Sequence, residues 1–525
     1  MQPRLKQNSV ALVGLFTLGV LSLTASTVRA NVSLPDVISE SMVLQQKQRV
    51  PIWGKADPGE SITVRFAGQT KKTVASADGN WIVKLDPLVA NATPASMVIS
   101  GNNTIELKNI LVGEVWLVAG QSNMQRLLSE TAYGEAAIAA ADHPLIRLFN
   151  VSRQVAFKHA PPPLAKWLAC SPQTVKDFSA AGYYFGVELQ KELHVPIGLI
   201  NSSYGGSQAE AWTPTEYLLA SNDLRPTVER TKVWDEERPR VRVEYDEALR
   251  KWRADADQAR AAGARPSPSP AVPDALREYR IASSIYDGMI APLIPFYIRG
   301  AIWYQGESNE ARAQQYGILL PTMIRSWRER WSEGNFPFAI VQLPNYRDAK
   351  PEPADEAWSH VREAQRLTAL NTPNTGLIVT IDIGEARDIH PKNKLDVGKR
   401  MARWALADVY GRKLTKSGPV FREAKPTGAK ILLKFDEVGA GLRIRDGDKL
   451  EEFAIAGADH VWHWANAKIV GKDHVEVWSD EVSQPVAVRY AFNNNPKHPN
   501  LTSDTGLPAT PFRTDNWPGP TDGKR

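Results

Sequence analysis

The chain has 525 residues, a formal net charge of +5 and a single cysteine, Cys170. Basic and acidic residues are interleaved along most of its length, which disfavours the clustered basic face that nucleic-acid binding needs. One cysteine excludes an intrachain disulfide and a cysteine-based metal site. Stability must therefore come from apolar cores, and the length predicts two or three domains.

The first thirty residues have the pattern of a secretory signal. Arg4 and Lys6 precede an apolar stretch at residues 10–23, and Val28-Arg29-Ala30 places small residues at the −3 and −1 positions of a cleavage site after Ala30. Removal of this segment lowers the formal charge from +5 to +2. An uncleaved anchor is the alternative, which the short, Ser/Thr-interrupted stretch disfavours. We expect a periplasmic or extracellular protein without a membrane span.

Two regions, one at each end of the mature chain, have the pattern of short antiparallel strands. In residues 31–110, alternating segments such as 61–66 and 81–85 are separated by turns such as Asp57-Pro58-Gly59. Residues 416–525 have the same character, with a strand-like segment at 431–435. We expect a β-sandwich, or part of one, in each region.

The middle region, residues 111–415, alternates strand-like and helical stretches. Buried strands are expected at residues 115–119, 197–200, 298–303, 338–343 and 377–381. This alternation predicts a parallel sheet with right-handed crossovers, whose ligands gather beyond the carboxyl ends of the strands.

Each candidate motif follows one of these strands. Ser122 follows the first strand, Tyr204-Gly205-Gly206-Ser207 the second, Gln305-Gly306-Glu307-Ser308-Asn309 the third and Asp388-Ile389-His390-Pro391 the last. The motifs therefore lie where a parallel sheet places its ligand site.

A charged stretch interrupts the core at about residues 226–275. Val241, Tyr245, Ala248 and Trp252 form one helical stripe, and the stretch ends in the proline-rich residues 266–270. We expect an inserted helical excursion that closes with a stiff loop. It is interpreted as a solvated surface arm, with a lid over the site as the alternative.

Ser122 has the position of a nucleophile. Gly120 allows a sharp turn after the strand, and the N–H groups of a following helix stabilise a developing oxyanion. The alternative is that Ser122 only caps that helix. Of the nine histidines, His390 alone follows a predicted core strand on a polar loop beside a candidate acid, which indicates a general base.

Four ordered blocks resemble the signature blocks of the sialate O-acetylesterase family of SGNH hydrolases. They are Gly120-Gln121-Ser122-Asn123-Met124, Gly205-Gly206-Ser207-Gln208-Ala209-Glu210-Ala211-Trp212, Trp303-Tyr304-Gln305-Gly306-Glu307-Ser308-Asn309 and Asp388-Ile389-His390-Pro391-Lys392-Asn393-Lys394. Residues 42–46, 56–60, 286–293 and 506–514 are also similar to the family. The resemblance covers nearly the whole mature chain.

The resemblance implies an α/β fold with a flavodoxin-like SGNH hydrolase core between the two β-sandwich regions. It implies that Ser122 attacks an acetyl ester and that His390 acts as general base and then general acid. By the same analogy the backbone N–H groups of Ser122 and Gly206 and the side-chain amide of Gln305 hold the oxyanion, with Gly205 as the alternative to Gly206.

Two carboxylates compete for the role of the acid that orients His390. SGNH enzymes usually place an aspartate three residues before the histidine, where this chain has Arg387. Asp388 is only two residues before it and reaches the imidazole if the segment is extended. Glu307, in the Gln-Gly-Glu block, is the rival, and a Ser–His dyad without an acid is the minority interpretation.

The resemblance further implies an acetylated carbohydrate as substrate. O-acetyl sialic acid follows from the family name, and acetylated xylan or another plant or bacterial glycan is the alternative. Trp212, Trp303 and Tyr304 lie near the motifs, where they stack on a sugar ring or, more commonly, pack in the core.

Other classes of protein fit less well. A non-catalytic carbohydrate-binding protein would not need Ser122 and His390, and a Ser-Lys peptidase or β-lactamase would need a lysine where Gln125 stands. Without a His-Glu-x-x-His motif a metal hydrolase is disfavoured. We therefore expect no metal or cofactor, no nucleic-acid partner and no membrane partner after signal cleavage. The sequence makes no prediction of oligomeric state.

Overall fold

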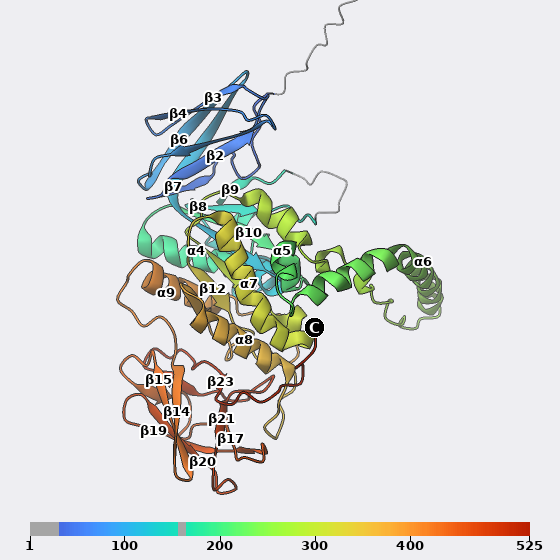
Figure 1. Cartoon of the computed structure of the whole chain (residues 1–525), viewed down its shortest axis with the longest axis vertical. Helices are drawn as coiled ribbons and strands as arrows, with labels where there is room; N and C mark the ends of the chain where they lie inside the picture. The colour runs from blue at the N-terminus through green and yellow to red at the C-terminus, as the bar shows by residue number, and fades with distance from the viewer. Residues whose placement is uncertain (1–30, 156–163) are drawn as a thin grey trace, which may run out of the picture.

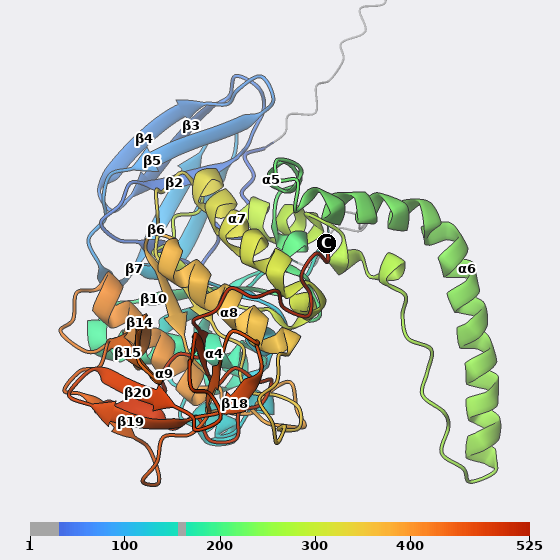
Figure 2. The same cartoon turned by 60° about the horizontal axis from the view of Figure 1, so that its bottom comes forward.

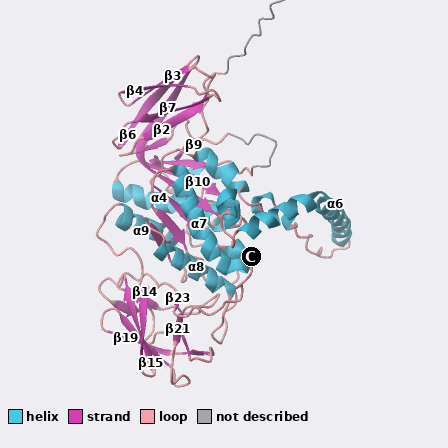
Figure 3. Ribbon diagram, viewed as in Figure 1, coloured by secondary structure: helices cyan, strands magenta, loops and turns pink. Residues whose placement is uncertain are grey.

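The computed structural model describes residues 31–155 and 164–525. Three regions follow one another along the long axis of the molecule: antiparallel strands near the N-terminus, a helix-covered sheet, and further antiparallel strands near the C-terminus (Figures 1 and 3). The chain is thus a mixed α/β protein with a large, mainly parallel central sheet. The expected signal at residues 1–30 lies outside the described residues.

The central sheet has the strand order β13-β12-β11-β7-β10-β8-β9, and every pair in it is parallel except β8 with β9. Its strands are β7 (Thr104–Gly120), β8 (His143–Asn150), β9 (Trp167–Cys170), β10 (Ile197–Ser203), β11 (Gly300–Tyr304), β12 (Phe338–Val341) and β13 (Thr375–Ile378). The predicted parallel sheet is confirmed. β8 and β9 were not among the expected strands.

Helices cover both faces of this sheet (Figure 1). On one face α4 (Ala180–Leu193) and α9 (Leu395–Trp404) share a core with Trp116 and Val118 of β7. On the other face α7 (Ala313–Trp331) and α8 (Ala357–Asn371) share a core with Leu117 and Ala119. Successive residues of a strand point to opposite faces, so a strand covered on both sides reads as a continuous apolar run.

β7 belongs to two of the three regions. Its first half pairs with β6 (Asn91–Ser100), and residues 111–113 pair with β1 (Val43–Gln45). Its second half, from Glu114 to Gly120, pairs with β10 and, from Trp116, with β11. The boundary expected near residue 110 therefore falls inside one continuous strand.

The other strands of the N-terminal region form antiparallel pairs, with β3 against β4 and β6, and β2 against β5. They are β2 (Val50–Lys55), β3 (Ser61–Phe66), β4 (Gln69–Val74) and β5 (Asn80–Leu85). In β3 and β5 buried residues alternate with exposed or partly exposed ones, the pattern of a sheet with one face on a core.

The C-terminal region contains two four-stranded antiparallel sheets, β14-β15-β20-β19 and β18-β17-β21-β23, and the pair β16-β22. Its strands are β14 (Val420–Thr427), β15 (Lys430–Asp436), β16 (Leu442–Ile444), β17 (Phe453–Ala456), β18 (Trp462–Trp464), β19 (Asn466–Val470), β20 (His474–Trp478), β21 (Ala487–Tyr490), β22 (Leu501–Ser503) and β23 (Phe512–Arg513). Leu433 of β15, Val477 of β20 and Val488 of β21 lie in one apolar core, which therefore joins both sheets.

The inserted stretch is a single long helix, α6 (Arg225–Ala261), that projects away from the body of the protein (Figure 2). Only Thr227, Val228, Thr231 and Ala256 are buried along it. Trp252 Nε1 donates to the carbonyl oxygen of Ser267 at 2.8 Å, so Trp252 of the expected stripe contacts the returning proline-rich segment. This arrangement favours the surface arm over the lid.

Four shorter helices complete the described α-helical elements: α1 (Ser122–Gln125), α2 (Gly134–Ala139), α3 (Pro172–Val175) and α5 (Thr215–Leu219). No helix within residues 31–155 and 164–525 is both long and apolar enough to cross a membrane.

Candidate active site

The backbone around Ser122 is set by the carboxyl ends of three neighbouring strands. Gly120 is the last residue of β7 and pairs with Ser203 of β10 and Tyr304 of β11. Its φ of 138° suits glycine, and a β-carbon there would lie 2.2 Å from the carbonyl oxygen of Tyr304. The chain therefore turns directly from the sheet into α1, which begins at Ser122.

Ser122 and His390 meet at this edge of the sheet. The Ser122 Oγ lies 2.8 Å from the His390 Nε2, which is hydrogen-bond distance, although the two residues are 268 positions apart. Both are partly exposed, so a substrate can reach the hydroxyl. This is the geometry of a nucleophile with its general base.

Asp388 is the nearer of the two candidate acids. Its Oδ1 lies 3.7 Å from the His390 Nδ1 and accepts the backbone N–H of His390 at 2.8 Å. Among the described residues, no other carboxylate has an oxygen within 4.0 Å of a ring nitrogen of His390. Glu307 instead accepts from the Asn123 Nδ2 at 2.6 Å. The geometry thus favours Asp388, at a separation longer than a hydrogen bond.

The four expected oxyanion donors differ in what they already bind. The Gly205 N–H donates to the Gln125 Oε1 at 2.7 Å, whereas the N–H groups of Ser122 and Gly206 donate to no acceptor in the described part of the chain. The Gln305 Nε2 donates to Ser207 and Asn309, and Gln305 is fully buried. Ser122 and Gly206 are therefore available as donors, whereas Gln305 would have to give up one of its hydrogen bonds.

A buried polar cluster fixes the loops after β10 and β11. Asn309 accepts from Gln305 and from the Ala209 N–H, and it donates to the Glu210 Oε2 at 2.8 Å. Arg230 and Arg312 donate to the other oxygen of Glu210. Sequence reasoning assigned no role to Asn309 or Glu210, although both lie in the signature blocks.

The pKa of His390 is lowered from its ordinary value. Burial is the main cause, the positive charges of Arg126 and Lys394 add to it, and Asp388 and Glu130 oppose it. A lowered pKa keeps the imidazole neutral at neutral pH, so that its Nε2 can accept the Ser122 proton.

The aromatic residues expected near the site belong to the core. Trp212, Trp303 and Tyr304 have no exposed surface, so they cannot stack on a sugar ring in this structure. Tyr204 and Tyr279 are partly exposed instead, and their rings stack with centroids 5.1 Å apart. Tyr279 also lies beside Gly206, because a β-carbon at Gly206 would be 3.2 Å from its ring.

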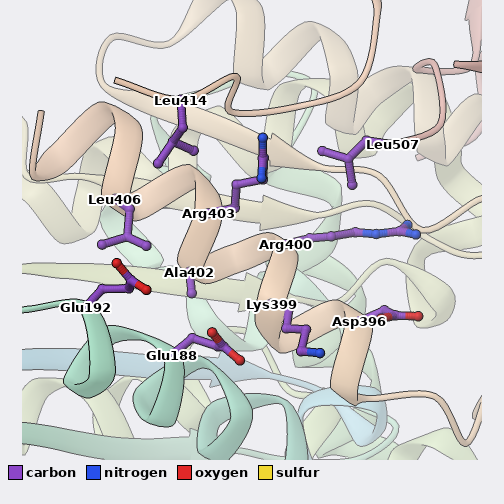
Figure 4. Close-up of a pocket in the computed structure, with 10 residues that line it drawn as sticks. All are labelled: Glu188, Glu192, Asp396, Lys399, Arg400, Ala402, Arg403, Leu406, Leu414 and Leu507. Carbon is purple, nitrogen blue, oxygen red and sulfur yellow. The ribbon is translucent and has the colours of Figure 1, made fainter. Parts of the chain in front are cut away.

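A surface pocket between α4 and α9 is separate from this site (Figure 4). Neither Ser122 nor His390 contributes to its wall. The residues that line it are Glu188, Glu192, Asp396, Lys399, Arg400, Ala402, Arg403, Leu406, Leu414 and Leu507. Arg400 is already paired with Asp382 at 2.7 Å.

The sequence matches the family model described as carbohydrate esterase, sialic acid-specific acetylesterase, over residues 112–255 and 274–407, more than half of the chain. The unmatched gap covers the end of α6 and the returning segment.

Similar proteins agree with this family. The chain is 29% identical to human sialate O-acetylesterase over 92% of this chain and 93% of that protein, and 30% identical to the mouse enzyme over 75% and 77%. A crystal structure of a carbohydrate acetylesterase from Xanthomonas citri is 35% identical, with a TM-score of 0.78, and the match covers 93% of this chain and all of that one. The chain therefore belongs to the sialic acid-specific acetylesterase family of carbohydrate esterases and is a carboxylic ester hydrolase.

Proposed function

We propose that this protein is a secreted serine esterase of the SGNH type that removes O-acetyl groups from sugars, with O-acetyl sialic acid as the substrate. The observation that carries the proposal is the 2.8 Å contact between the Ser122 Oγ and the His390 Nε2 at the carboxyl edge of a parallel sheet. The sialate O-acetylesterase relatives support the substrate.

In the first half of the reaction, the Ser122 hydroxyl attacks the acetyl carbonyl carbon while His390 takes its proton. The carbonyl oxygen becomes an oxyanion, which the free N–H groups of Ser122 and Gly206 bind. The imidazolium then gives its proton to the leaving sugar oxygen as the ester bond breaks. The products of this half are a free sugar hydroxyl and an acetyl group on Ser122.

In the second half, His390 takes a proton from a water molecule that attacks the acetyl-enzyme. Collapse of the second tetrahedral intermediate releases acetate and returns the proton to Ser122. Asp388 stabilises the imidazolium in both halves through its charge. The scheme uses side chains and backbone N–H groups of this chain and one water molecule. No group of three or more metal-ligating residues is present in the described ranges.

The substrate is tested by measuring acetate release from three acetyl esters. O-acetylated sialic acid, acetylxylan and a small aryl acetate are compared by kcat/KM. We expect the sialate to give the highest value. A preference for acetylxylan would favour the alternative, which is compatible with the broader name of the Xanthomonas citri structure, a carbohydrate acetylesterase.

The nucleophile is tested by trapping the acetyl-enzyme. Rapid acid quenching during turnover, followed by peptide mass spectrometry, should find one acetyl group on the peptide that contains Ser122.

Absence of acetate release from all three esters, combined with retained sugar binding, would instead support a carbohydrate-binding protein.

Secretion rests on residues 1–30, whose structure is not described. We expect the secreted protein to begin at Asn31, which N-terminal sequencing checks. Retention of Met1 in a membrane fraction would identify an uncleaved anchor.

A further inference from the structure

Two buried side chains hold the backbone on the two sides of His390. The Asn123 Nδ2 donates to the carbonyl oxygen of Ile389 at 2.9 Å, and the Lys394 Nζ donates to that of Pro391 at 2.7 Å. Asn123 directly follows the nucleophile in α1. The peptide before His390 is therefore tied to the helix that carries Ser122.

These side chains are also joined to each other and to Glu307. The Lys394 Nζ donates to the Asn123 Oδ1 at 2.7 Å, and the Asn123 Nδ2 donates to the Glu307 Oε1 at 2.6 Å. Asn123 and Lys394 have no exposed surface. One connected group of hydrogen bonds thus reaches α1, the loop after β11 and the segment that carries His390.

His390 depends on such contacts because its segment has no helix or strand. Between Ile378 at the end of β13 and Leu395 at the start of α9, the chain contains only turns and an isolated bridge between Glu385 and Asp388. Other ties to the rest of the protein are at Val379, Thr380, Asp382, Gly384, Ala386 and Lys392. The contacts that flank His390 come from Asn123 and Lys394.

A gain in folding stability does not explain why the charged groups of Lys394 and Glu307 are buried. Burial lowers the pKa of Lys394 to about 7, although the Glu307 carboxylate opposes this shift. The Glu307 Oε2 has no hydrogen-bond partner among the described residues. Lys394 and Glu307 both bond to Asn123 and form no direct ion pair within 4.0 Å. Burial of a charge without a direct partner costs free energy, so a geometric role is the stronger explanation.

We propose that Asn123, Lys394 and Glu307 form a clamp that holds the His390 Nε2 on the Ser122 hydroxyl, with Lys394 as a positioning residue. This inference rests on the proposed roles of Ser122 and His390. Without the Lys394 ammonium, the Pro391 carbonyl loses its partner and the imidazole is free to shift. A displacement of about 1 Å costs on the order of 10²-fold in rate.

The test is K394M, with K392M as the matched control. Lys392 is an exposed lysine two positions away in the same segment. We expect K394M to lower kcat about 100-fold while KM stays within about twofold of the wild-type value. K392M should keep wild-type kinetics. A K394M variant that changes only KM, or that keeps kcat within about threefold, would overturn the clamp.

The pH profile separates positioning from a general loss of structure. Lys394 lowers the pKa of His390 together with burial and Arg126, whereas Asp388 and Glu130 raise it. Removing the Lys394 charge should therefore move the acidic limb of kcat/KM to higher pH. An unmoved limb in folded K394M contradicts the electrostatic contact on which the clamp depends.

N123A provides an independent variant, because the smaller side chain leaves the charged residues in place. It should lower kcat as K394M does, and the double variant should lose no more than the worse single variant, since both act through one unit. Losses that multiply would overturn the clamp. S122A is measured alongside: activity in S122A refutes the proposed function, whereas an inactive S122A with wild-type kcat in K394M and N123A refutes the clamp alone.

Discussion

The two halves of the proposed site are held in place by different means. Ser122 begins α1 two residues after Gly120, which pairs with β10 and β11, so backbone hydrogen bonds of the sheet determine its position. His390 lies on a segment of turns, and side chains of distant residues determine its position. We therefore expect the position of Ser122 to tolerate most nearby substitutions, whereas the position of His390 should be sensitive to the loss of single side chains that do not touch the substrate.

S122A should cause the largest loss of activity among these variants. It removes the reacting oxygen atom and leaves intact the backbone that the sheet holds in place. We expect acetate release to fall by about 10³-fold or more with little change in thermal unfolding. Steady-state kinetics and a melting curve of the same preparation check this. Retention of more than about a tenth of the wild-type rate would remove Ser122 from its role.

G120A should destabilise the turn between β7 and α1, which places Ser122. The added β-carbon would lie 2.2 Å from the Tyr304 carbonyl oxygen, at a φ of 138°, so we expect a loss of about 3–5 kcal/mol in the free energy of unfolding.

G263A is the matched control for G120A. Gly263 also has a positive φ, of 70°, but nothing lies within 4 Å of a β-carbon there, so the cost should be only about 1 kcal/mol. Urea titration of both variants measures the difference. Equal losses of unfolding free energy in the two variants would mean that the close contact between residue 120 and β11 does not affect stability.

D388N should weaken catalysis by His390, the residue whose position depends on side-chain contacts. Loss of the carboxylate removes the charge that stabilises the imidazolium, and we expect kcat to fall about 10²-fold with KM nearly unchanged. E307Q should cost less, because the Gln carbonyl can still accept from Asn123. If E307Q proves more damaging than D388N in folded protein, Asp388 is not the acid, and Glu307 acts either as the acid or through the clamp. Near-wild-type turnover in both variants would leave a Ser–His dyad.

The pH profile should show the smallest effect. Activity needs neutral His390, whose pKa burial and nearby cations lower, so kcat/KM should rise with pH through a midpoint below about 6.5. Asp388 raises this pKa, and D388N should therefore move the midpoint further down, opposite to the shift expected for K394M. A rate that is independent of pH from about 5 to 8, with chemistry limiting, would contradict the role of His390.

The sheet and its motif-bearing ends could be predicted because buried parallel strands are short apolar runs. The run that ends at Ala119 shows this most clearly, since all of its residues from Val115 are buried. β8 could not be found in the same way. The buried Arg147 interrupts its apolar residues. Its guanidinium donates to Pro144 and to Asn109, which lies in a distant strand, and only the fold reveals the second contact.

The side-chain contacts of the site could not be predicted. Asn123 meets Glu307 across 184 positions and Lys394 across 271, and no local pattern links such residues. The choice between Asp388 and Glu307 depended on the conformation of a segment without regular structure. Gln305 was expected as an oxyanion donor by analogy alone, which could not indicate that Asn309 and Ser207 already use its amide. Its role stays a prediction.

Because β7 is one continuous strand, the protein cannot be truncated between the N-terminal region and the central sheet without exposing part of that strand. A fragment that begins after β6 would keep Thr104–Gly120 but leave the first half of that strand without its neighbours, with Leu107, Ile110 and Leu111 exposed. Such an edge is a template for intermolecular pairing. We therefore expect the central sheet to aggregate when it is produced without the N-terminal strands, because β6 covers the first half of the strand that leads to Ser122.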